Sequence, residues 1–249
     1  MRNLTILTSA ALLVATTTAW AHGEGDHAHG IVAPTGTAEH ADFDIVSAAI
    51  TTEGRIATFT MSVAGTPGAT GPDPAGGLAG APVFSYVWPT SLDPSVVGFE
   101  TGAGILAFAV TIHPDFDDTP LFDEGNTGRT DDDGGIWHSH WVVLGPDEAC
   151  GPGALKVMDI PDGTTPALPL TWPGLPLLID SPGWSPIFAG ETLSVRVPFA
   201  DIGAVEAARY DGVTAALRVN AIIHAPLLCV TDVFDVASGD LSLPGRVNH

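Results

Sequence analysis

The chain has 249 residues, of which 45% are hydrophobic, and its 29 acidic residues against eight basic ones give a net charge of −21. This length and apolar content suffice for a large buried core. Such a negative field repels nucleic acid and anionic membrane surfaces, so we exclude both as partners, and it concentrates cations. Acidity also keeps an exported protein soluble, and charge alone does not choose between these two roles.

The first 21 residues have the features of a signal peptide. Met1–Asn3 is short and positively charged, Leu4–Val14 is apolar, and Ala19–Ala21 has the small-x-small pattern of a cleavage site before His22. The apolar stretch is too short to span a membrane. We therefore expect a soluble protein that is exported to the periplasm or secreted.

Residues 22–42 are expected to form a flexible, histidine-rich arm, because they are polar and have no periodic apolar face. After cleavage before His22, the free amine and the imidazole of this residue can chelate copper together. This resembles the N-terminal copper site of lytic polysaccharide monooxygenases and of some periplasmic copper carriers. We assign His22, His27 and His29 to an accessory metal site.

From Phe43 onward the sequence predicts a single all-β domain, residues 43–249. Apolar runs separated by turn residues predict strands at 43–50, 55–63, 83–88, 105–113, 136–144, 155–160, 175–179, 192–199, 214–224 and 230–236. Residues 65–82 consist almost entirely of turn-formers and are expected to be a loop, and residues 201–209 contain the best helix signal. Nine or ten strands with one short helix indicate an antiparallel β-sandwich or a closed barrel.

Two histidines stand one residue apart in the strand-like run Gly135–Leu144. Alternate side chains of a strand share a face, so His138 and His140 project to one side and Trp137 and Trp141 to the other. The spacing lets both imidazoles reach one metal ion, and it resembles the strand-borne ligands of copper-zinc superoxide dismutases and α-type carbonic anhydrases. With the tryptophans packed in the core, we expect the histidines to face solvent or a cleft. Two histidines without a role on an ordinary strand are the alternative.

Two further histidines end apolar strands, and each is followed by a proline within two residues. Because proline cannot continue a sheet ladder, His113 and His224 lie where their strands stop, and strand ends are where binding sites are built. We therefore predict a main metal site formed by His113, His138, His140 and His224. The alternative for the first and the last is a hydrogen bond to a turn.

The segment between His113 and the His-x-His strand is rich in carboxylates, with eight acidic residues and the single base Arg129. These carboxylates repel one another unless cations compensate for their charge. We predict that Asp115, Asp117, Asp131 and Asp133 either bind calcium or accept hydrogen bonds from the outer ring N–H groups of the histidine ligands.

Cys150 and Cys229 are the two cysteines of the chain. In an oxidising compartment they predict one disulfide, which removes thiolates from the candidate ligands. Imidazoles without thiolates suit zinc or copper(II), whereas the scarcity of methionine disfavours a copper(I) carrier. Haem held by a strand-end histidine and Met61 is a further alternative.

These features indicate an exported metal-binding protein that stores, buffers or delivers copper or zinc, with a periplasmic or outer-membrane metal-handling protein as a possible partner. The sequence contains no nucleophile elbow and no phosphate-binding glycine loop, which favours a role other than catalysis. One alternative is a metal-dependent hydrolase or lyase with a three-histidine zinc site. The other is an interaction module that calcium stabilises.

Overall fold

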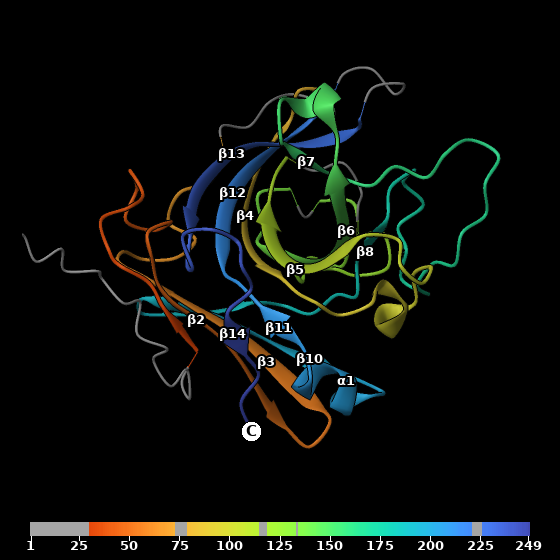
Figure 1. Cartoon of the computed structure of the whole chain (residues 1–249). Helices are drawn as coiled ribbons and strands as arrows, with labels where there is room; N and C mark the ends of the chain where they lie inside the picture. Colours follow the sequence, from red (N-terminus) through yellow and green to blue (C-terminus); the bar gives the residue numbers. More distant parts are fainter. Residues whose placement is uncertain (1–29, 73–78, 115–118, 133, 221–225) are drawn as a thin grey trace, which may run out of the picture.

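The computed structural model describes residues 30–72, 79–114, 119–132, 134–220 and 226–249 (Figure 1). The signal peptide predicted at residues 1–21 lies outside these ranges, as do His22, His27, His29, Asp115, Asp117, Asp133 and His224. Among the residues that are described, no helix has the length and apolar character needed to cross a membrane. The prediction of an antiparallel all-β fold is confirmed.

The larger sheet closes into a six-stranded barrel. Its strands are β4 (Pro82–Pro89), β5 (Ile105–Ile112), β6 (His138–Pro146), β7 (Leu155–Val157), β12 (Val213–Val219) and β13 (Leu228–Val236). They pair in the order β5-β4-β12-β13-β7-β6, and β5 also pairs with β6, which closes the ring (Figure 1). The short strand β8 (Ile179–Asp180) pairs with the middle of β6.

A second antiparallel sheet covers one side of the barrel. It contains β1 (Ile31–Val32), β2 (Ile45–Glu53), β3 (Ile56–Val63), β10 (Thr192–Pro198) and β9 (Ile187–Ala189). Figure 1 shows this sheet below the barrel, with the small pair β11 (Arg209–Tyr210) and β14 (Gly245–Arg246) and the helix α1 (Ile202–Glu206) beside it. Two 3-10 helices, η1 (Pro94–Val97) and η2 (Glu148–Cys150), lie in the connections.

The two apolar cores differ in side-chain size because strand alternation sends different residues to each. Between the second sheet and the barrel wall, the ring of Phe59 lies within 6 Å of the rings of Trp88, Phe108 and Trp141, measured between centroids. The hydrophobic core inside the barrel, in contrast, consists of Ala, Val, Leu and Ile, and none of its described residues is Phe, Tyr or Trp. Large rings fill the first core, whereas small branched side chains leave room in the second.

The main differences from the predicted strands occur where proline interrupts the chain. Strands predicted at 155–160 and 175–179 are reduced to β7 and β8, with one isolated bridge between Asp159 and Leu177. Pro161 directly follows the first stretch and Pro176 lies inside the second, and proline cannot donate to a ladder. The strands β1, β9, β11 and β14 have two or three residues each, too few for an alternating pattern to be read from sequence.

The predicted arm includes residues that pack on the second sheet. Ile31 lies opposite Ala48 of β2 and is buried. After this strand, the Asp44 carboxylate accepts hydrogen bonds from the backbone N–H groups of Gly36, Thr37 and Ala38. Burial opposes ionisation of Asp44, but these hydrogen bonds outweigh it and lower the pKa of the carboxyl.

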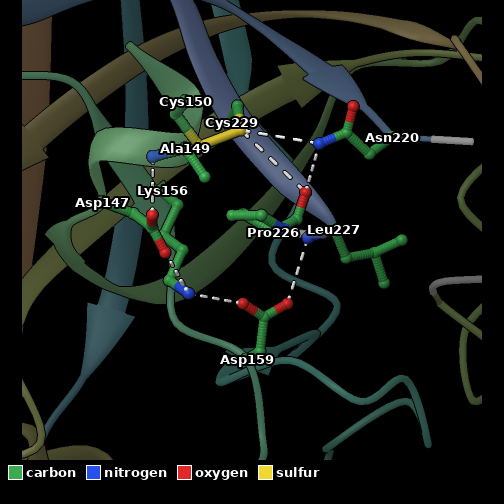
Figure 2. Close-up of polar contacts among 9 residues, drawn as sticks. All are labelled: Asp147, Ala149, Cys150, Lys156, Asp159, Asn220, Pro226, Leu227 and Cys229. Carbon is green, nitrogen blue, oxygen red and sulfur yellow. Dashed lines mark hydrogen bonds and ion pairs between the residues drawn. A yellow bond between two sulfur atoms is a disulfide. The ribbon is translucent and has the colours of Figure 1, made fainter. Parts of the chain in front are cut away.

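The predicted disulfide between Cys150 and Cys229 is present and joins η2 to β13 (Figure 2). Beside it, the ammonium of Lys156 lies 2.8 Å from the carboxylate of Asp147 and 2.7 Å from that of Asp159. Hydrogen bonding to this ammonium lowers the pKa of Asp147. Asp159 in turn accepts a hydrogen bond from the backbone N–H of Leu227, which ties β13 to the segment after β7.

Candidate metal site

Three of the four histidines predicted as the main site lie together, and two paired strands bring them there. His138 and His140 are the first and third residues of β6, and His113 follows Ile112, the last residue of β5. Because Thr111 lies opposite His138, the end of β5 runs beside the start of β6. The alternation of both strands turns these imidazoles toward the inside of the barrel.

The three imidazoles are close enough to share one ion. Each offers a nitrogen that lies within 4.8 Å of the other two, and Nε2 of His113 is 3.0 Å from Nε2 of His138. The ring centroids of His138 and His140 are 4.7 Å apart. Nitrogens on one tetrahedral zinc ion lie about 3.3 Å apart, because each Zn–N bond is about 2.0–2.1 Å long. The cluster is therefore near the geometry that a bound ion requires.

The prediction that the histidines face solvent is wrong for the described residues, whereas His113 and His140 do line a cavity inside the barrel. His113, His138 and His140 are only 3%, 2% and 1% exposed. Trp141, on the other face of β6, is buried in the aromatic core, as predicted. Both faces of β6 are covered because the strand forms a wall between two cores, the aromatic core and the interior of the barrel.

Hydrogen bonds at Nδ1 assign the tautomers of two of the rings. Nδ1 of His113 lies 2.8 Å from the carbonyl oxygen of Pro114, and Nδ1 of His138 lies 2.8 Å from that of Ile136. A carbonyl oxygen only accepts, so both Nδ1 atoms carry the proton and donate it. In a neutral imidazole the other nitrogen, Nε2, then presents a lone pair. Donation of the outer N–H to a backbone carbonyl is typical of histidines that bind a metal.

This assignment points two lone pairs at each other. With neutral rings, the Nε2 atoms of His113 and His138 are both acceptors at a separation of 3.0 Å. Two such lone pairs repel each other, and the repulsion is stronger in a buried site of low dielectric. A proton between them removes the conflict by charging one ring, whereas a metal ion removes it by accepting both lone pairs. The arrangement therefore favours a cation at this point.

The third imidazole is oriented by the residue that directly follows β8, and sequence reasoning missed this residue. Nδ1 of His140 lies 3.1 Å from the hydroxyl oxygen of Ser181, which directs Nε2 toward the cluster. The backbone N–H of Ser181 donates to the carbonyl of Thr171, and Asp180 before it pairs with Trp141 of β6. Burial raises the pKa of the Asp180 carboxyl, although a hydrogen bond from Thr171 opposes the shift. No spacing signal links Ser181 to a histidine 41 residues away, because only sheet pairing joins them.

The other candidate residues are not part of this cluster or lie outside the described ranges. Asp131 forms an ion pair with Arg129 at 2.8 Å, and both side chains are 63% exposed. Met61 is buried in the core between the sheets, outside the barrel that encloses the histidines. Within the described part of the chain, the three histidines are the one group of potential metal ligands that meets. Calcium binding by the acidic segment, and the roles of the arm and of His224, stay predictions.

Comparisons with family models, with curated proteins and with solved structures found no match to this chain.

Proposed function

We propose that the protein binds one zinc or copper(II) ion through His113, His138 and His140 inside the barrel and retains it. The observation that carries this proposal is the pair of facing Nε2 atoms, 3.0 Å apart, whose rings both donate Nδ1–H to carbonyl oxygens. Neutral imidazoles suit zinc and copper(II), and the disulfide removes both thiols from competition.

Burial favours a retained ion over one that is passed on quickly. A partner that takes an ion must bring its own ligands to it, and here the ligand side chains are at most 3% exposed. The predicted arm, with His22, His27 and His29, offers a second, looser set of imidazoles for capture. Storage is thus the role that the buried cluster supports best, with the arm as an accessory site.

The test is metal retention by the purified chain, produced without a histidine tag. After incubation with zinc or copper(II) and exhaustive dialysis, we expect one equivalent per chain, measured by elemental analysis. His138→Asn, which removes a ligand but keeps a polar group of similar size, is expected to retain less than a tenth of an equivalent.

The matched control replaces His22, His27 and His29 with alanine and is expected to keep the full equivalent. His224→Ala tests the predicted fourth ligand, and we expect one equivalent bound about tenfold more weakly. Far-UV circular dichroism checks that each variant is folded. A wild-type chain that retains no metal, or a folded His138→Asn variant that retains one equivalent, would overturn the proposal.

A further inference from the structure

A cavity of about 120 Å³ lies inside the barrel and reaches two of the histidines. Its walls are largely aliphatic, with small residues such as Ala109 and Ala215 beside Val87, Val142 and Leu217. Small side chains facing one another across a closed ring cannot meet in the middle, so space remains. An apolar cavity of about 150 Å³ in another protein stays dry and takes up benzene, so this one is of the size for about five or six non-hydrogen atoms.

The polar groups of the cavity gather on one part of its wall. His113, His140, Thr111 and Ser85 belong to the lining, and Ser85, Thr111 and His138 are neighbours across β4, β5 and β6. The hydroxyl of Ser85 donates to the carbonyl of Ala215 at 3.0 Å, so its lone pairs remain as acceptors. A molecule in the cavity therefore meets hydrocarbon over most of its surface and the histidines at one end.

The charge of the metal site indicates which chemical group of a ligand would lie at the histidine end of the cavity. Three neutral imidazoles add no negative charge to a zinc or copper(II) ion, and none of the described lining residues is acidic. An uncompensated charge in an apolar interior is costly, so an anionic ligand at the ion is favoured. The cavity also reaches the surface, because its lining includes Val233 and Leu241, which are 47% and 44% exposed.

We infer that the barrel binds a short-chain carboxylate of four or five carbons, with the carboxylate on the metal ion and the hydrocarbon chain in the cavity. This inference rests on the proposed metal site for its polar end and on the cavity for its apolar end. The ligand class is therefore small aliphatic acids. The volume of the cavity limits the length of their hydrocarbon chain.

The experiment is calorimetric titration of the zinc-loaded chain with acetate, propanoate, butanoate and pentanoate. Each methylene buried in the cavity is expected to raise the affinity about fourfold, so pentanoate, with three more methylenes, binds roughly 60-fold more tightly than acetate. The metal-free chain is expected to bind pentanoate at least tenfold more weakly than the zinc-loaded chain. The same affinity for all four acids would overturn the inference, and so would equal binding without zinc.

Ala215→Leu fills the cavity from β12 and is expected to weaken pentanoate binding at least tenfold while one zinc is retained. The matched control is Ala216→Leu on the same strand, which points away from the cavity and should bind pentanoate as the wild type does. If Ala215→Leu does not fold, the NMR shifts of wild-type methyl groups on addition of pentanoate test the site instead. The methyl resonances of Val213, Leu217 and Val219 should shift with pentanoate, and those of Leu193, Val195 and Val197 should not; the reverse would overturn the inference.

The two proposals fail in different ways. Retention of one zinc with no effect of chain length would overturn the carboxylate site and leave the metal site standing. No retained zinc would overturn the metal site, and metal-dependent carboxylate binding would fall with it.

Discussion

In each histidine of the cluster, Nδ1 forms a hydrogen bond with another group of the protein, and Nε2 is directed into the site. Carbonyl oxygens hold Nδ1 of His113 and His138, and the hydroxyl of Ser181 holds Nδ1 of His140. The two carbonyls come from residues adjacent to or near the histidines, so they are local to the chain. The serine directly follows β8, so its contact is the one among the three that depends on the pairing of β8 with β6. Its loss should loosen a ligand without unfolding the site.

Ser181→Ala is expected to weaken zinc binding about tenfold, because the ring of His140 loses the partner that orients it. Competition titration with a chromophoric chelator measures the change. The matched control is Ser139→Ala in β6, whose hydroxyl donates to the carbonyl of Trp184 and faces the other core. This control should lose stability but keep its zinc affinity. An unchanged affinity in Ser181→Ala would show that the hydroxyl of Ser181 does not position the ligand.

At the scale of elements, hydrogen bonds to the buried carboxylate of Asp44 hold residues 36–38, after β1, close to the start of β2. Besides three backbone N–H groups, the carboxylate of Asp44 accepts a hydrogen bond from the hydroxyl of Thr37. The lowered pKa of Asp44 means that the folded state holds its proton less tightly than the unfolded chain does. The stabilisation is therefore present above the ordinary pKa of 3.8 and is lost as the pH falls through the lowered value.

Asp44→Asn is expected to lower the free energy of unfolding at pH 7 by about 1–3 kcal/mol, since an amide accepts fewer of these hydrogen bonds. Urea denaturation at several pH values measures the loss, which should shrink below pH 3.8 as the wild-type carboxyl gains its proton. Asp232→Asn, on an exposed part of β13, serves as the control and should have little effect at any pH. A loss independent of pH would contradict the role of the charge.

For the whole molecule, the disulfide joins positions 79 residues apart in the sequence. Closing a loop of this length removes entropy from the unfolded chain, which the chain-entropy estimate equates with about 4 kcal/mol of stability. The bridge also holds η2 against the start of β13, beside the ion pairs of Lys156 (Figure 2). The disulfide thus ties the connection between β6 and β7 to β13, and the ion pair of Lys156 with Asp147 ties the same connection to β7.

Replacing both Cys150 and Cys229 with alanine is expected to lower the free energy of unfolding by about 2–5 kcal/mol. Urea denaturation measures the difference. A reductant should bring the wild type to the stability of the variant and should leave the variant itself unchanged. Equal stability of the oxidised wild type and the variant would rule out this contribution.

The sequence by itself determined the features that depend on local pattern and composition. Strand alternation indicated the all-β class and placed His138 and His140 opposite Trp141, and the pair of cysteines predicted the disulfide. The prediction of the faces succeeds because the two-residue alternation of a strand depends only on neighbouring residues. The prediction of the disulfide succeeds because two cysteines pair in an oxidising compartment.

Only the tertiary structure decided what lies on the histidine side of β6. The closure of β5 onto β6 brings His113 to the pair and puts all three imidazoles inside a barrel instead of at a surface. Ser181 and the residues that line the cavity come from segments far apart in the sequence, and no local pattern encodes how these segments pair. The reason is physical: side-chain periodicity assigns a residue to a face, whereas the partner of that face is chosen by long-range packing of the whole sheet.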